Sequence, residues 1–319
     1  MSAARTPRHA SMASNLAAID GLEARAGESL AGHTTFRIGG PAEWYVELST
    51  TAALRRLLVL IAASRTPIQI LGLGSNILFP DDGLPGVVVR LAGDFRRLVI
   101  DGTTVTAGAA LSLSGVARKT ARAGLVGLEA LSGFPSTVGG AVVMNAGCYG
   151  AEIHEVLATA TLVEPDGAER QVTAAELEPG YRTSNLQGTA TIVAEAVFEL
   201  TTGDATAAVA CIDALNRKRW RALPSGVASA GSIFKNPPGD YAGRLLEACG
   251  LKGRAHGGAR ISSRHANVIV NEQGASASDV LALMLEMRAA VGDRFAVELV
   301  PELVLAGRLA DLWRAESCR

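Results

Sequence analysis

Residues 133–150 read GFPSTVGGAVVMNAGCYG. This stretch contains five glycines and one proline but no acidic or basic side chain, whereas ordinary surface loops are more polar. Glycine lets a backbone approach another group closely, and the backbone amides of such a stretch are available for hydrogen bonds. We therefore predict an extended segment that lies flat against a large planar ligand.

A second glycine loop, Gly72-Leu73-Gly74-Ser75-Asn76, follows a short apolar run at residues 68–71 that is typical of a strand. Its glycines allow N–H groups to reach phosphate oxygens, so the loop is either a diphosphate cradle or a structural turn. It is not a Rossmann fingerprint, because Ile77 and Pro80 interrupt that pattern. The two glycine loops together favour a dinucleotide ligand.

The hydrophobic periodicity predicts a mixed α+β chain. Its first part contains a helix around residues 54–61, strands at 68–71 and 87–91, hairpins that turn at 101–102 and 165–167, and a strand at 191–200. After a helix from about 205 to 220 come a strand at 232–234, a helix ending at Gly250, a strand at 267–270 and a helix with an apolar face over 280–291. We expect these last elements to form a small α+β domain.

The composition describes a folded enzyme or ligand-binding protein. With 319 residues, 48% of them hydrophobic and 19% charged, the chain is long enough for two or three domains. Its formal net charge of −1 argues against nucleic acid as a partner, and no apolar run approaches the ~20 residues that cross a bilayer. Four widely spaced cysteines predict reduced thiols in the cytoplasm and neither a disulfide framework nor a metal site: Cys148, Cys211, Cys249 and Cys318.

Several separated motifs carry a family resemblance from about residue 30 to residue 308. They are Thr34-Thr35-Phe36 with Gly39-Gly40, residues 71–78, residues 133–150, Tyr181-Arg182-Thr183-Ser184, Gly231-Ser232-Ile233-Phe234-Lys235-Asn236-Pro237, Gly257-Gly258, and Pro301-Glu302. In this order they resemble the UDP-N-acetylenolpyruvoylglucosamine reductases, the MurB family. The chain departs from the family pattern at His33 and Ser136, and its short span from Pro237 to Gly250 resembles the compact subtype without an extra tyrosine-bearing loop.

The resemblance implies an α+β fold of the vanillyl-alcohol-oxidase or PCMH type, in which two subdomains bind FAD and a C-terminal domain binds substrate. We expect a disordered leader at 1–15, FAD-binding subdomains at 16–66 and 67–220, and a substrate-binding domain at 221–319. The implied reaction uses NADPH to reduce UDP-N-acetylglucosamine enolpyruvate to UDP-N-acetylmuramate for peptidoglycan synthesis. We expect a cytoplasmic monomer with FAD as cofactor and NADPH as co-substrate.

Three residues are candidates for catalysis. By resemblance, Ser232 is the general acid that protonates the carbon next to the substrate carboxylate, and Glu302 has a catalytic role. Arg182 has a permanent charge and a fork of donors suited to a carboxylate, although a surface ion pair is the competing interpretation. Glu302 lies among apolar residues that we expect to form a strand, where a protonated carboxyl could share the developing negative charge with Arg182.

The remaining candidates bind ligands. We expect the two glycine loops to hold the cofactor through Gly72, Gly74, Ser75, Asn76, Gly133, Pro135, Thr137, Gly139, Gly140, Asn145 and Gly147. For the diphosphate and amide groups of the UDP-sugar, the candidates are Lys235, Asn236, Arg264 and His265.

Two other functions compete with this interpretation. A flavin oxidase of the same fold would keep the cofactor loops, but Ser232 together with Glu302 disfavours it. A nucleotide-binding protein without activity would use the same loops to hold a ligand, and the colour of the purified protein discriminates against it.

Overall fold

The computed structural model describes residues 7–224 and 226–317 and divides the chain into two compact units. Unit 1 comprises residues 1–26, 44–72 and 86–215, and unit 2 comprises 27–43, 73–85 and 216–319. Each unit has its own hydrophobic core. Two early segments, 27–43 and 73–85, therefore fold with the C-terminal part of the chain, an arrangement that the predicted boundaries at 16–66, 67–220 and 221–319 do not contain.

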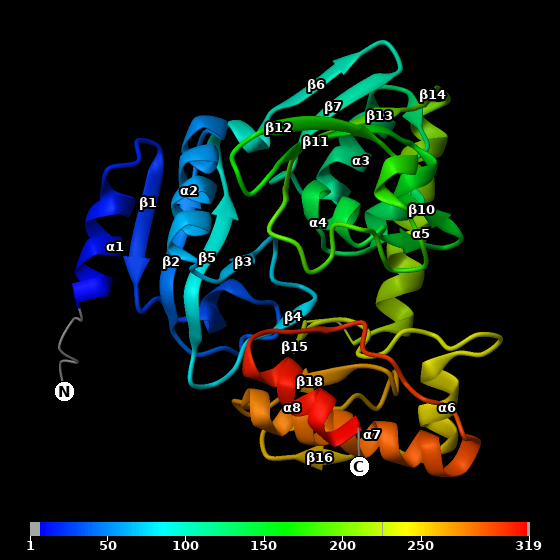
Figure 1. Cartoon of the computed structure of the whole chain (residues 1–319). Helices are drawn as coiled ribbons and strands as arrows, with labels where there is room; N and C mark the ends of the chain where they lie inside the picture. Colours follow the sequence, from blue (N-terminus) through cyan, green and yellow to red (C-terminus); the bar gives the residue numbers. More distant parts are fainter. Residues whose placement is uncertain (1–6, 225, 318–319) are drawn as a thin grey trace. The chain divides into compact units, whose positions relative to one another are not determined.

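One sheet of unit 1 has the order β1-β2-β5-β3, formed by β1 (Leu22–Ala26), β2 (Ala42–Leu48), β5 (Leu84–Leu91) and β3 (Ile68–Ile70). Helix α2 (Thr51–Ser64) lies beside this sheet (Figure 1) and buries Leu54, Leu57, Leu58 and Ile61. The Thr50 side chain caps its first turn, and Arg65 ends it in the left-handed conformation. Strand β3 pairs parallel to β5. The predicted helix around 54–61 and the predicted strands at 68–71 and 87–91 are therefore confirmed.

The second sheet of unit 1 is antiparallel with the order β12-β11-β13-β7-β6. Its strands are β6 (Leu98–Asp101), β7 (Thr104–Gly108), β11 (Leu157–Val163), β12 (Glu169–Thr173) and β13 (Ile192–Glu199). Both predicted hairpins are present, with Gly102 and Gly167 at positive φ in their turns. Helices α3 (Leu113–Arg122) and α4 (Val138–Val143) lie on one side of this sheet (Figure 1), and α5 (Ala205–Ala222) follows it.

The glycine-rich stretch at 133–150 is not the extended segment that its composition suggests. Residues Ala130–Gly133 form a 3-10 helix, Val138–Val143 form α4, and Gly147–Cys148 form strand β9, which pairs with β10 (Ala151–Glu152). The Thr137 hydroxyl caps α4 by accepting the Gly140 N–H, and the Gly139 N–H donates to the Ala109 carbonyl. Glycine in this stretch permits close packing of the helix rather than an extended chain.

Unit 2 is built on the sheet β15-β18-β17-β16, formed by β15 (Ala228–Ser229), β18 (Ile269–Asn271), β17 (Ala259–Ile261) and β16 (Ala255–His256). Helix α7 (Ala277–Phe295) packs on it, with α6 (Ala242–Ala248) and α8 (Arg308–Ser317) against α7 (Figure 1). A capping box of Ser276 and Asp279 starts α7, and the Asp81 carboxylate accepts the N–H groups of Ala277 and Ser278 there. Asp81 thus fastens segment 73–85 to the C-terminal domain.

Three sequence expectations need correction. Helix α1 (Pro7–Ala17) occupies residues expected to be disordered, because Met12 and Leu16 are buried in the core of unit 1; residues 1–6 of the expected leader lie outside the described residues. The expected strand at 232–234 is a loop with a single bridge from Phe234 to Pro301. Glu302 precedes a two-residue strand, β19 (Val304–Leu305), which pairs with β4 (Ile77–Leu78).

The remaining elements are short. They are strands β8 (Leu125–Val126) and β14 (Thr201–Thr202), which pair with each other, and 3-10 helices Leu30–His33, Gly93–Arg96, Ile153–Glu155 and Ala175–Leu177.

Candidate active site

The two predicted glycine loops meet within unit 1. A Cβ atom added to Gly72 would lie 2.7 Å from the Thr137 hydroxyl oxygen, so the end of the first loop packs directly on the cap of α4. Thr137 itself is buried, with 8% of its surface exposed. Gly72 and Thr137, which are 65 positions apart in sequence, are therefore neighbours within unit 1.

The first loop has donors to offer to an anion. In the described part of the chain, the backbone N–H groups of Leu73, Gly74 and Asn76 donate to no protein acceptor. Leu73 and Asn76 are half-buried. Successive N–H groups without protein partners form a concavity that binds phosphate oxygens, so this loop fits the diphosphate of a dinucleotide.

A side chain at either of two predicted cofactor glycines, Gly74 and Gly139, would meet protein atoms and not open space. A Cβ at Gly74 would lie 2.1 Å from the His33 carbonyl oxygen, and the φ of Gly74 is +63°. A Cβ at Gly139 would lie 2.9 Å from the Cβ of Ala109. We expected glycine at these positions because a ligand approaches closely. The structure shows instead that other parts of the protein approach closely there, and this contact shapes the loop.

Asn145 uses its side chain within unit 1. Its Nδ2 donates to the Glu152 carboxylate at 2.7 Å and to the Gly180 carbonyl at 2.9 Å, and its Oδ1 lies 3.1 Å from Nδ1 of His154. The residue is 2% exposed and has a φ of 39°. Asn145 therefore ties the glycine-rich segment to the loop that carries Arg182.

Arg182 is fixed by the same segment. One guanidinium nitrogen donates to the Gly147 carbonyl at 2.6 Å, and the guanidinium carbon lies 5.3 Å from the ring centre of Tyr181. Its φ of 56° is uncommon for a residue other than glycine. Two neighbours hold the loop in place, since the Ser184 hydroxyl donates to the Val143 carbonyl and the Gln187 amide donates to the Arg182 carbonyl. Strained backbone held by such contacts is typical of functional sites.

Ser232 and Glu302 are brought together in unit 2. Both are half-buried, and the N–H of Glu302 donates to the carbonyl of Ile233, the residue after Ser232, at 2.8 Å. The Lys235 N–H donates to the Val300 carbonyl at 2.8 Å on the other side of the Phe234 bridge to Pro301. No described residue of unit 2 makes a hydrogen bond with the Ser232 hydroxyl.

Asn76 joins the first glycine loop to this pair. Its Nδ2 donates to the Glu302 carbonyl at 3.0 Å, and its own carbonyl accepts the Val304 N–H at 3.1 Å. Asn76 was predicted as a cofactor residue, but its amide nitrogen contacts the backbone of a predicted catalytic residue. The loop at 73–76 and the Ser232–Glu302 pair are thus one hydrogen-bonded structure within unit 2.

The four predicted substrate residues differ in what their side chains contact. Asn236 is exposed and its Oδ1 accepts the Ala242 N–H at the start of α6, while Arg264 donates to the carbonyls of Trp220 and Arg221 near the end of α5. The His265 ring packs on Gly243, and burial lowers the pKa of His265 below its usual range, which favours the neutral imidazole. Lys235 is half-buried next to the Ser232–Glu302 pair.

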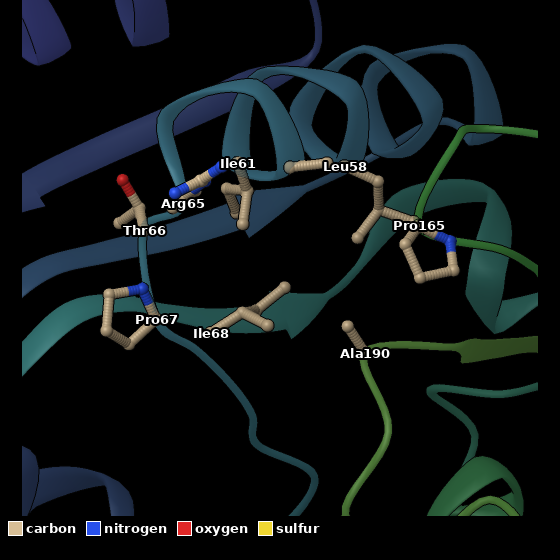
Figure 2. A pocket seen from close by; sticks show the side chains of 9 residues that line it. Leu58, Ile61, Arg65, Thr66, Pro67, Ile68, Pro165 and Ala190 are labelled. Atoms are coloured by element: carbon tan, nitrogen blue, oxygen red, sulfur yellow. The ribbon is translucent and has the colours of Figure 1, made fainter.

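An apolar cavity of about 320 Å³ lies elsewhere in unit 1. Figure 2 shows Leu58 and Ile61 of α2 and Ile68 of β3 around it, together with Pro165 and Ala190. No predicted site residue lines this cavity. Its apolar walls offer little chemistry, so this cavity does not mark the candidate active site.

The described residues include neither a metal cluster nor a membrane-spanning helix. No group of three or more His, Cys, Asp and Glu side chains within 7–224 and 226–317 could hold a metal ion. Likewise, none of the helices in those ranges combines the length and the apolar character needed to span a membrane.

Comparison with known proteins agrees with this geometry. Residues 42–173 match the FAD binding domain family, and residues 223–306 match the C-terminal domain of UDP-N-acetylenolpyruvoylglucosamine reductase. UDP-N-acetylenolpyruvoylglucosamine reductase 2 of Symbiobacterium thermophilum is 45% identical over 89% of this chain and 92% of its own length. The chain belongs to the UDP-N-acetylenolpyruvoylglucosamine reductase family.

Further members of the reductase family are similar over nearly the whole chain. The reductase of Halalkalibacterium halodurans is 40% identical over 92% of this chain and 97% of its own length. The crystal structure of the reductase (MurB) from Thermus caldophilus superposes with a TM-score of 0.77 at 37% identity, covering 90% of this chain and 99% of the other. These findings confirm the predicted family, the predicted PCMH-type fold with its C-terminal domain, and FAD as the cofactor.

The family matches separate the predicted residues into groups. Every predicted cofactor residue, from Gly72 to Gly147, lies within the FAD binding match, while Ser232, Glu302 and the substrate candidates lie within the C-terminal match. Arg182 lies between the two matched regions. The sequence did not point to Asn267, whose side chain bonds to Phe234 in the Ser232 loop. A single asparagine in an apolar run has no recognisable pattern, and only its burial in the structure draws attention to it.

Proposed function

We propose that this chain reduces the enolpyruvyl group of UDP-N-acetylglucosamine enolpyruvate to give UDP-N-acetylmuramate, with FAD as cofactor and NADPH as reductant. This is the step of peptidoglycan precursor synthesis for which its relatives are named. The structural observation that carries the proposal is the hydrogen-bonded pairing of the Ser232 loop with Glu302, because a flavin protein that only binds nucleotide needs no such pair.

The glycine loops would hold FAD, which when bound would supply the hydride equivalent of NADPH for the terminal carbon of the substrate double bond. The chain must then hold the negative charge that moves onto the substrate carboxylate and deliver a proton to the carbon beside it. The atoms balance, since one hydride and one proton convert the double bond into a single bond. These two tasks fall to side chains of the protein.

Ser232 is assigned the proton delivery. The enolate is a strong base, so a hydroxyl can protonate it, provided that the alkoxide left behind is stabilised and reprotonated. A half-buried hydroxyl with no hydrogen-bond partner in its own unit is available for a ligand. Its loop is held at Ile233 and Phe234, which limits the freedom of the donor.

Arg182 and Glu302 are assigned the developing charge. The Arg182 guanidinium is a permanently charged, planar fork of donors, which suits a carboxylate that gains charge. A protonated Glu302 would donate a hydrogen bond to the same oxygens without adding a second charge. Lys235 leads the substrate-binding candidates, whereas the contacts of Asn236, Arg264 and His265 within unit 2 favour supporting roles for those three.

The glycine loops are assigned the cofactor. The open N–H groups of Leu73, Gly74 and Asn76 are suited to the diphosphate of FAD, and the Thr137 cap of α4 packs against Gly72 at the start of that loop. We infer a cytoplasmic enzyme, because its substrate is a nucleotide sugar, and a monomer, which light scattering at several concentrations tests.

Anaerobic mixing tests the function. The purified, FAD-loaded protein is first titrated with NADPH and then with UDP-N-acetylglucosamine enolpyruvate, while the flavin absorbance is followed. We expect bleaching, then recovery, and a product two hydrogen atoms heavier than the substrate by mass spectrometry. Recovery with UDP-N-acetylglucosamine, which lacks the enolpyruvyl group, or recovery only after oxygen is admitted would contradict the proposal and favour a flavin oxidase.

A further inference from the structure

Asn267 is a buried polar residue whose side chain and backbone carbonyl bond to one neighbouring loop, while its N–H donates to the His265 ring. It is 3% exposed and lies two residues before the start of β18 (Ile269–Asn271). Its Oδ1 accepts the Phe234 N–H at 2.9 Å, its Nδ2 donates to the Phe234 carbonyl at 2.8 Å, and its backbone carbonyl accepts the Ile233 N–H at 3.0 Å. Three hydrogen bonds therefore hold the two residues that follow Ser232.

The first of these two residues, Ile233, also bonds to the segment that contains Glu302. The Ile233 carbonyl accepts the N–H groups of Glu302 at 2.8 Å and Leu303 at 3.2 Å. Ile233 and Phe234 thus form a short piece of backbone with Asn267 on one side and the Glu302 segment on the other. A displacement of this backbone would move Ser232 and the Glu302 main chain together.

An asparagine is suited to this place because its amide offers one acceptor and one donor at a fixed separation. The N–H and carbonyl of Phe234 take both, so every polar group of this buried amide that faces the loop is paired. An aspartate would keep the acceptor but would set a carboxylate oxygen against the Phe234 carbonyl. Two acceptors facing each other in a buried site repel, and the loop must shift to separate them.

We propose that Asn267 is a positioning residue of the reductase: it fixes the Ser232 loop and, through Ile233, the Glu302 segment in the geometry that protonation needs. This inference rests on the proposed function, because it assigns Asn267 an effect through Ser232. Asn267 takes no part in binding FAD, and its effect is confined to the step in which the enolpyruvyl substrate reacts.

Asn271 is a matched control. Its Nδ2 donates to the Phe36 carbonyl at 3.0 Å and its Oδ1 accepts the Ala275 N–H at 2.8 Å, so it clamps backbone in the same way and in the same unit. Neither of these side-chain hydrogen bonds reaches the Ser232 loop or the Glu302 segment. Asn271→Asp therefore produces the same chemical change without moving the proposed proton donor.

The experiment compares Asn267→Asp, Asn271→Asp, Ser232→Ala and the double variant Asn267→Asp/Ser232→Ala as FAD-loaded full chains. For each variant, urea unfolding gives stability, flavin absorbance gives FAD occupancy, and anaerobic stopped flow gives the rates of reduction by NADPH and of reoxidation by substrate. Asn267→Ser, which keeps one hydroxyl and introduces no charge, serves if Asn267→Asp does not fold.

We expect Asn267→Asp to keep its FAD and its rate of reduction while reoxidation slows on the order of 10²-fold, the loss that a misplaced reacting group produces. In the double variant the two losses should not multiply, since Asn267 acts in part through Ser232. Wild-type reoxidation in Asn267→Asp, an equal loss in Asn271→Asp, or losses that multiply in the double variant would overturn the inference. Wild-type reoxidation in Ser232→Ala would instead overturn the proposed function on which it rests.

Discussion

The guanidinium of Arg182 donates a hydrogen bond of 2.6 Å to the carbonyl oxygen of Gly147 in the glycine-rich segment at 133–150. A Cβ at Gly147 would lie 3.1 Å from the other guanidinium nitrogen and 2.8 Å from Cγ of Glu152. Glycine is therefore needed at 147 for the arginine to reach its backbone. The predicted charge-stabilising residue and the predicted cofactor segment are thus parts of one local structure.

Replacing Arg182 by lysine tests the value of this geometry. The variant keeps the positive charge but loses the planar fork, so it cannot bind the Gly147 carbonyl and a substrate carboxylate with separate nitrogens. We expect reoxidation by the enolpyruvyl substrate to slow by about 10² or more, with FAD occupancy unchanged. Arg170→Lys is the control, because Arg170 pairs with Glu164 on the surface of unit 1 and should retain wild-type rates. Loss of FAD from Arg182→Lys would instead mean that the arginine supports the cofactor loop.

Gly74→Ala tests whether the first glycine loop is shaped by backbone contact. The added methyl group would lie 2.1 Å from the His33 carbonyl oxygen at a φ of +63°, so both crowding and conformational strain oppose it. Gly102 has nearly the same φ, +58°, but nothing within 4 Å of its Cβ direction, so Gly102→Ala reports the strain alone. We expect Gly102→Ala to lower the free energy of unfolding by about 1 kcal/mol with FAD retained, and Gly74→Ala to lower it further and to lose FAD. Equal unfolding midpoints in urea for the two variants would remove the crowding argument.

The cap of α7 gives the chain an acid-sensitive contribution to stability. The backbone hydrogen bond from Ser276, aided by further bonds from Ser276 and Gly258, lowers the pKa of Asp279 below its value of 3.8 in an unfolded chain. A lowered folded-state pKa stabilises the fold fully above the unfolded pKa, and the stabilisation is lost as the pH falls from about 3.8 through the folded value. In Asp279→Asn, the free energy of unfolding should therefore fall less steeply with pH below 4 than in the wild type. Parallel curves for the two proteins, measured by urea unfolding at each pH, would show that Asp279 contributes nothing to acid sensitivity.

Local patterns predicted most elements of the chain because each follows from neighbouring residues. Alternation and turn residues located the hairpins around Gly102 and Gly167, and helical spacing located α2 and α7. The glycine-rich segment at 133–150 was predicted as extended because its glycines and lack of charge suggested close contact with a planar ligand, yet the Thr137 cap and contacts with Ala109 stabilise α4 there. Tertiary contacts determine the structure at this point, and no local pattern reports them.

The site was predictable as a set of residues but not as a structure. Motifs named Ser232, Arg182 and Glu302, whereas the hydrogen bonds that link Asn76 and Asn267 to this set join residues 226 and 33 positions apart. The exchange of segments 27–43 and 73–85 into unit 2 was likewise invisible, since it depends on contacts such as those of Asp81 with the start of α7. Long-range pairing of single polar groups leaves no periodic trace in a sequence.

Anaerobic stopped flow of Ser232→Ala tests whether Ser232 delivers the proton. The variant removes one hydroxyl, so FAD occupancy and the rate of reduction by NADPH should match the wild type. Reoxidation by UDP-N-acetylglucosamine enolpyruvate should slow by ~10² to 10⁴, the contribution of a positioned general acid, and Ser232→Cys should recover part of the rate because a thiol still donates a proton. Reoxidation of Ser232→Ala at the wild-type rate would contradict the account and remove Ser232 from the mechanism.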